Sequence, residues 1–250
     1  MLDVDSLIAI GLTFLLAGFV KGVIGLGLPT VSLALLAATV GLHAGMALLI
    51  VPSFVTNVWQ GVAGGKLVPI LKRQWPFLAM TCVGTWFGVK GLVRIDPSLL
   101  TALLGVLLCM YAGLNLKRVR KPDIARFEAW LGPVCGAATG VLTGLTGSFV
   151  VPGVIYLQAL NIPRDYLIQT MGVAFTVSTI ALAVGLNDQR LISPDLGLLS
   201  AAGVVPALVG MVIGQRLRGQ MSEALFLRVF FAALALLGVY LTVRSLITYD

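Results

Sequence analysis

Long runs of apolar residues alternate with short charged segments along the whole chain. About 20 apolar residues cross the hydrocarbon core of a bilayer as a helix, so this pattern predicts about ten membrane segments. The two at 6–20 and about 129–143 are short and run into glycine-rich breaks, and a further break is expected near 41–43. The apolar runs cover residues 6–20, 22–65, 74–89, 97–116, 129–163, 166–187, 196–215 and 224–247.

The composition identifies lipid as the solvent. Of the 250 residues, 58% are hydrophobic and 11% are charged, against about 25% charged in an ordinary soluble domain. The mean hydropathy is +1.02. We therefore expect an all-α, polytopic, multi-pass membrane protein in contact with the lipid bilayer. The three cysteines lie far apart and match no metal spacing, so neither a metal nor a cofactor is expected.

The chain resembles a tandem duplication. A first repeat at 1–115 and a second at 129–250 flank a basic linker at 116–128. Similar motifs recur in the same order in both repeats. The stretch Gly18–Pro29 corresponds to Gly136–Pro152, Phe54 corresponds to Phe175, and the pair Gly84 and Gly88 corresponds to Gly210 and Gly214.

The loop charges favour an inverted arrangement of the two repeats. With five crossings per repeat, eleven Lys and Arg residues lie on the side of the linker and four on the other side. With eight full spans arranged as four plus four, the repeats are parallel and the split is ten to five. The positive-inside rule favours the inverted model and puts the linker in the cytoplasm in both. Because the net charge of +7 lies in such loops, we expect no nucleic-acid partner.

The glycine-rich breaks are the candidate binding site. Closely spaced glycines allow a membrane helix to unwind, and a helix that restarts there points its N-terminal N–H groups at an anion near the midplane. Polar residues crowd at these breaks and on two other segments. The candidate substrate-binding residues are Lys21, Gly22, Gly25, Gly27, Asn57, Gln60, Thr143, Gly144, Thr146, Gly147, Ser148 and Ser178.

Each candidate also has a structural interpretation. Glycines at four-residue spacing pack helices closely, polar side chains such as Asn57 and Gln60 form hydrogen bonds between helices, and Lys21 can extend to an interface. Every Asp and Glu lies at a terminus or in a loop, which disfavours a cation as substrate. A bound anion would supply a negative charge opposite Lys21. The residues therefore favour a small anionic substrate.

At these motifs the chain resembles the TauE/SafE family of sulfite and organosulfonate exporters. The resemblance covers nearly the whole chain and rests on the two glycine motifs that begin at Gly18 and Gly140, placed around a basic linker. Leu28 and Ser148 stand where further glycines often occur in the family. The resemblance implies a secondary transporter that exports sulfite or an organosulfonate across the bacterial inner membrane.

Other functions remain as alternatives. The chain could carry another small metabolite, inward or outward, or serve as a membrane assembly subunit without transport. An intramembrane enzyme would use Ser148 with His43, but no motif surrounds either residue, so we do not expect an enzyme. Association of two copies as a homodimer is left open.

Overall fold

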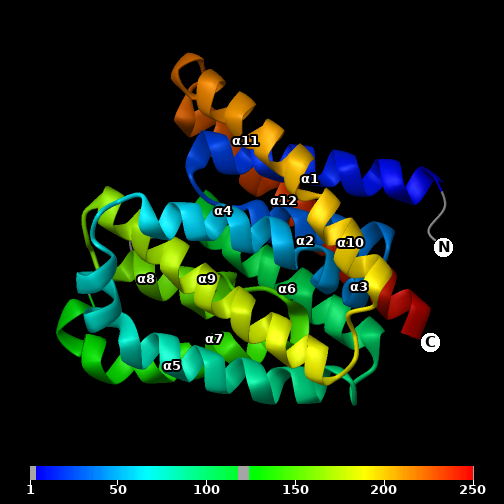
Figure 1. The fold of residues 1–250 in the computed structure, drawn as a ribbon, viewed down its shortest axis with the longest axis horizontal. Coiled ribbons are helices and arrows are strands. Elements are labelled where there is room, and N and C mark those ends of the chain that lie inside the picture. Colours follow the sequence, from blue (N-terminus) through cyan, green and yellow to red (C-terminus); the bar gives the residue numbers. More distant parts are fainter. Residues whose placement is uncertain (1–3, 118–123, 250) are drawn as a thin grey trace. The chain divides into compact units, whose positions relative to one another are not determined.

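The computed structural model describes residues 4–117 and 124–249 of the chain, and these form helices and turns without a strand (Figure 1). The all-α prediction is confirmed for this part of the chain. Residues 118–123 of the basic linker predicted at 116–128 lie outside the described residues. The helices are α1 (Val4–Ile24), α2 (Leu28–Thr39), α3 (Leu42–Leu48), α4 (Ile50–Val62), α5 (Leu67–Leu92), α6 (Pro97–Leu116), α7 (Glu128–Thr146), α8 (Ile155–Ala159), α9 (Arg164–Asp188), α10 (Pro194–Ala202), α11 (Val204–Leu217) and α12 (Glu223–Tyr249).

The helices form two compact units, and each unit contains segments from both halves of the sequence. The first comprises the described residues of Met1–Pro52, Pro97–Arg118 and Ile192–Asp250. The second comprises those of Ser53–Asp96 and Val119–Leu191. The units of packing therefore do not follow the proposed repeats, which describe similarity of sequence.

In the first unit, α1 packs along α11 through glycines (Figure 1). A Cβ added to Gly18 would collide with the backbone oxygen of Ala207, and a Cβ added to Gly22 would collide with that of Met211. Contacts advance in the same direction along both helices, so α1 and α11 are parallel. Phe14 of α1 is fully buried in the core of this unit.

In the second unit, α5 and α7 make the corresponding contact. A Cβ added to Gly140 would collide with the backbone oxygen of Thr81, and one added to Gly144 would lie 2.5 Å from that of Thr85. These two helices are also parallel. Small residues at the interface allow the two backbones to approach closely, as in other membrane helix pairs.

The remaining long pair, α6 and α12, is antiparallel and lies in the first unit. A Cβ added to Gly105 would lie 2.5 Å from the backbone oxygen of Gly238. Further along α6, and further back along α12, the rings of Tyr111 and Phe231 meet at 5.5 Å between centroids. Between these contacts, the Cys109 thiol donates to the carbonyl oxygen of Ala235.

Five helical segments of the described chain are long and apolar enough to cross a membrane, and a sixth is counted if α3 and α4 form one bent span. The five are Val4–Ile24, Pro97–Leu116, Arg164–Asp188, Pro194–Gln220 and Glu223–Thr248. The chain is therefore a multi-pass membrane protein. The number of crossings in each half remains a prediction.

Two predicted boundaries are wrong. The segment expected to be short at 6–20 is the 21-residue helix α1, which continues past Lys21 to Ile24. One buried charge does not end a helix, because the backbone hydrogen bonds are unaffected by it. Likewise Lys72 and Arg73, which lie before the apolar run predicted at 74–89, belong to α5, since both residue types favour helix.

Candidate functional site

The predicted break in the first half lies between α1 and α2, at two glycines with left-handed backbone conformations. Gly25 has φ 78° and Gly27 has φ 104°, values that residues with a Cβ rarely adopt. The N–H of Gly25 donates to the carbonyl oxygen of Lys21 at 2.8 Å, which closes the last turn of α1. The sequence therefore ends one helix and begins another within three residues.

The N-terminus of α2 faces this break without a capping side chain among the described residues. Gly27 occupies the N-cap position, and Pro29 lies in the first turn, where its missing N–H costs no helical hydrogen bond. The hydroxyl of Ser32 donates to the carbonyl oxygen of Leu28 at 2.7 Å and so does not cap the helix. The first N–H groups of α2 are thus suited to an anion.

Lys21 lies in the interior of the first unit, in the last turn of α1. Its side chain is 5% exposed, and it is the only charged residue among the buried residues that the structure describes. A lysine that extends to a membrane interface would be far more exposed, so this burial disfavours that interpretation. Lys21 and the start of α2 place positive charge and helix dipole close to the same break.

The break lies beside the first turns of α12 and not beside its middle. A Cβ added to Gly27 would lie 3.7 Å from Cζ of Phe230 and 3.3 Å from Cγ1 of Val20. The rings of Phe19 and Phe226 meet edge to face at 6.1 Å between centroids. Phe226 and Phe230 belong to the first two turns of the 27-residue helix α12.

The break in the second half follows α7 at Gly147, which has φ 74°. Its N–H donates to the carbonyl oxygen of Thr143 at 2.7 Å, the same closure that Gly25 makes with Lys21. The Thr143 hydroxyl donates to the Ser148 carbonyl oxygen at 3.2 Å, and the Thr146 hydroxyl accepts from the Ser148 N–H at 3.2 Å. Thr143 and Thr146 therefore hold the shape of the turn.

Two buried serine hydroxyls in the second unit have no hydrogen-bond partner among the described residues. Ser148 at the break is 2% exposed, and Ser53 on α4 is fully buried. A buried hydroxyl without a partner is unfavourable in an apolar environment, which makes both groups candidates for binding a ligand. Sequence reasoning missed Ser53, although it lies four residues before Asn57 and therefore on the same helix face.

The second break leads into a short apolar helix, as the first does. A π-helical turn at Val150–Val154, with a cis bond before Pro152, continues into α8, and the two together span Val150–Ala159. The corresponding helix after the first break, α2, has 12 residues. Val151 has an extended backbone conformation with φ −124° and ψ 128°, so the chain after the second break is less regular than the start of α2.

Two predicted site glycines lie in helix contacts. A Cβ added to Gly22 would lie 2.9 Å from the backbone nitrogen of Gln215, and one added to Gly144 would lie 2.6 Å from that of Val89. Close packing therefore explains Gly22 and Gly144 without a ligand. Gly84, Gly88, Gly210 and Gly214 have the four-residue spacing expected for helix packing, and a Cβ added to any of them would likewise collide with the backbone of a neighbouring helix.

Gln60 also has a structural partner within the second unit. Its side-chain amide donates to the carbonyl oxygen of Ile168 on α9 at 2.7 Å. A second hydrogen bond joins the same two helices: the side-chain amide of Gln169 on α9 donates to the carbonyl oxygen of Gly61 on α4 at 2.8 Å. Gln60 therefore joins α4 to α9. Asn57 and Ser178, the other two candidates on these helices, are buried, with exposed fractions of 0% and 1%.

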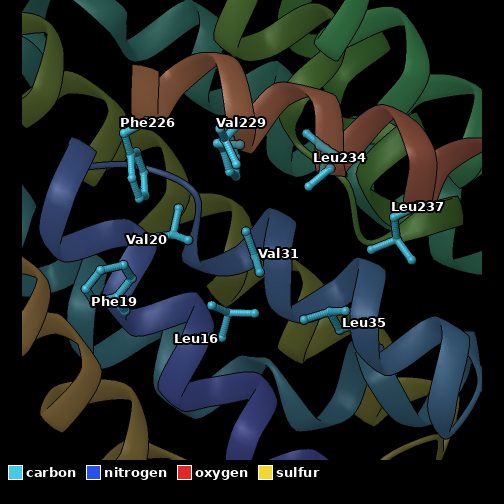
Figure 2. A pocket seen from close by; sticks show the side chains of 11 residues that line it. Leu16, Phe19, Val20, Val31, Leu35, Phe226, Val229, Leu234 and Leu237 are labelled. Carbon is cyan, nitrogen blue, oxygen red and sulfur yellow. The ribbon is translucent and has the colours of Figure 1, made fainter. Parts of the chain in front are cut away.

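An apolar cavity of about 350 Å³ lies in the first unit between α1, α2 and α12 (Figure 2). Figure 2 shows side chains from all three helices around it, and none of the eleven lining residues carries a polar side chain. An anion would lose its hydration there without gaining a hydrogen bond, so this cavity does not suit one. The lining residues are Leu16, Phe19, Val20, Val31, Leu35, Phe226, Val229, Phe230, Ala233, Leu234 and Leu237.

Comparison with known proteins identifies one family. The model of the family described as "Sulfite exporter TauE/SafE" matches residues 10–241. The match spans both glycine breaks, most of α1, all of α2 to α11 and most of α12. No curated protein and no solved structure matches the chain.

Proposed function

Because the chain belongs to the sulfite exporter TauE/SafE family, a family of membrane transporters, we propose that it exports a small anion across the bacterial inner membrane. Sulfite or an organosulfonate is the proposed substrate. The family match over residues 10–241 carries this proposal. Transport, and not catalysis, is the activity that membership of this family implies.

The first break offers positive charge to an anion. Lys21 is buried there, and α2 begins there with N–H groups that no side chain caps among the described residues. A charged amine and a helix N-terminus stabilise an anion by charge-assisted hydrogen bonds and by the helix dipole. Gly25 and Gly27 give the backbone the conformation that this arrangement needs.

The second break offers neutral donors. We assign Ser148 and Ser53 as substrate-binding hydroxyls, because both are buried and neither has a partner among the described residues. Asn57 and Ser178 are proposed as further polar lining residues. Gly147 contributes its left-handed backbone conformation, while Thr143 and Thr146 act indirectly by holding the turn.

We further propose that the two halves are inverted repeats. The contact of Gly140 with Thr81 has a counterpart in the contact of Gly18 with Ala207, and both helix pairs are parallel. The helices that end the two halves, α6 and α12, are antiparallel. Equivalent helices of inverted repeats run in opposite directions, whereas those of parallel repeats run in the same direction. These observations favour five plus five crossings over four plus four.

Flux through reconstituted protein tests the proposed function. The purified chain in liposomes should release loaded sulfite or a short organosulfonate faster than protein-free liposomes do. Phosphate and a neutral amino acid serve as comparison substrates. Flux of the amino acid alone would favour a different metabolite carrier. Absence of flux for every compound, with folded protein in the membrane, would favour an assembly subunit and contradict the proposal.

A further inference from the structure

A recess of about 190 Å³ lies in the first unit between the end of α6 and the start of α12. It shares no lining residue with either glycine break. Four of its lining side chains are apolar, one is an amide and one is a guanidinium. The lining residues are Asn115, Leu116, Ala224, Leu227, Arg228 and Phe231.

Arg228 is the charged member of this recess and lies among exposed apolar residues. Its neighbours Leu225 and Val229 are each 60% exposed on a helix that qualifies as a membrane span. Arg228 itself is exposed, and no hydrogen bond or ion pair joins it to another described residue. A guanidinium on a lipid-facing surface requires an anion or water at that depth.

Arg228 lies near the start of α12. It is five residues beyond Glu223, the first residue of the helix, or about 8 Å along the axis. The side chain of an arginine at this depth extends toward the membrane surface while its methylene groups stay in contact with apolar surface. The guanidinium therefore reaches the level of lipid phosphates if α12 begins at the membrane surface.

Positive charge and a second donor occur together at this end of the helix pair. Asn115 uses one amide hydrogen to donate to the carbonyl oxygen of Tyr111 at 2.7 Å, which leaves its other hydrogen for a ligand. Lys117 follows on the exposed end of α6. At the opposite end of the pair, the guanidinium of Arg244 already donates to the carbonyl oxygen of Ala38 at 2.8 Å and to the hydroxyl of Tyr240 at 3.0 Å.

We propose that this recess binds the phosphodiester headgroup of an anionic phospholipid. Arg228 offers two parallel N–H groups that match two phosphate oxygens, and Asn115 offers a further donor. Leu116 and Leu227 contact the glycerol and the first acyl carbons. A free anion has the same charge but no apolar part, so the mixed lining favours a lipid. Basic pockets between membrane helices bind lipid phosphates in this way.

Lipid binding is measured with the full chain, purified in neutral detergent and stripped of lipid. Phosphatidylglycerol in mixed micelles should raise the unfolding temperature and should remain bound in native mass spectrometry. Phosphatidylcholine should have a smaller effect, and soluble glycerol phosphate none. Arg228→Gln should weaken phosphatidylglycerol binding about fivefold or more, and Arg228→Lys should retain part of it.

Arg216→Gln is the matched control, because it removes the same charge from an exposed position outside the recess. It should bind phosphatidylglycerol like the unmodified chain. Equal binding by Arg228→Gln, or equal stabilisation by phosphatidylcholine, would overturn the proposal. Saturation by glycerol phosphate would assign the recess to a free anion instead. Asn115→Leu provides a second variant with the charge intact, and it should bind the lipid more weakly.

Discussion

Gly140 of α7 lies directly against Gly84 of α5. A Cβ added to Gly140 would lie 2.9 Å from the Cα of Gly84, and a Cβ added to Gly84 would lie 3.0 Å from the Cα of Gly140. The nearest atoms on each side belong to backbone, which cannot move away as the end of a flexible side chain can. The two helices are thus held at a separation that a side chain would increase.

Gly140→Ala should destabilise the protein by about 1–3 kcal/mol, because the new methyl group would force α5 and α7 apart. Gly113→Ala is the control, since a Cβ at this helical position meets no atom within 4 Å. That variant should match or exceed the stability of the unmodified chain, because alanine favours helix over glycine. Unfolding in detergent, followed by temperature, measures both. Equal stabilities would contradict the packing role.

Gly147→Asn should be tolerated better than Gly147→Ala. The left-handed conformation at φ 74° costs most L-residues about 1–2 kcal/mol, and asparagine adopts it more readily than alanine. The difference should appear as a higher unfolding temperature for the asparagine variant. The same order is expected for sulfite flux in liposomes. A reversed order for stability would show that space, and not backbone conformation, limits this position.

Lys21→Gln should weaken binding of the substrate anion about 10- to 100-fold, since it removes a charge-assisted hydrogen bond. Lys21→Arg should retain partial function, because it keeps the charge and changes the geometry. The control is Lys90→Gln, which alters an exposed lysine located over the ring of Trp86. Equal affinities for Lys21, its Gln variant and its Arg variant would exclude Lys21 from the site.

A cysteine at position 190 separates the two topologies. Arg190 is exposed in the turn after α9. Under five plus five crossings this turn is periplasmic, and under four plus four it is cytoplasmic. In a background with Cys82, Cys109 and Cys135 replaced by Ala, an impermeant thiol reagent should label Arg190→Cys in intact cells. Labelling only after the membrane is opened would favour the parallel arrangement.

The Arg73–Glu128 ion pair should couple α5 to α7 by about 1 kcal/mol. Arg73 donates to Glu128 from two nitrogens at 2.6–2.7 Å, and Gln74 donates to the same carboxylate at 2.6 Å. Both partners are partly exposed, at 38% and 18%, so solvent limits the effect. A double-mutant cycle with Arg73→Gln and Glu128→Gln measures the coupling. It should fall as salt is raised, and a coupling near zero would contradict a stabilising role.

The sequence was sufficient to predict a membrane protein, the positions of the glycine breaks and the glycines through which helices pack. Apolar runs and glycine spacing are local patterns, and local patterns determine helices and their contact faces. The partner of each glycine pair was not predictable. Nothing near Gly18 indicates that it faces Ala207 rather than a helix of its own half, because that choice depends on contacts between distant segments.

The site was predicted less completely for the same reason. Gly144 and Gly25 occupy similar motifs, yet Gly144 packs against α5 whereas Gly25 forms the turn itself. Ser53 was missed because a serine in an apolar helix is common. Only the environment of its hydroxyl, buried and without a partner among the described residues, distinguishes it.

The interleaving of the two units determines the order in which they can be completed during synthesis. All described segments of the second unit lie before residue 192. By contrast, α1 packs against α11, and Gly18 is separated from Ala207 by about 190 residues. At about 5–20 residues per second, the ribosome needs about 10–40 s to supply that partner. During this interval the glycine face of α1 has no native partner, so lipid or the insertion machinery must cover it, and the helix synthesised first is among the last to reach its final packing.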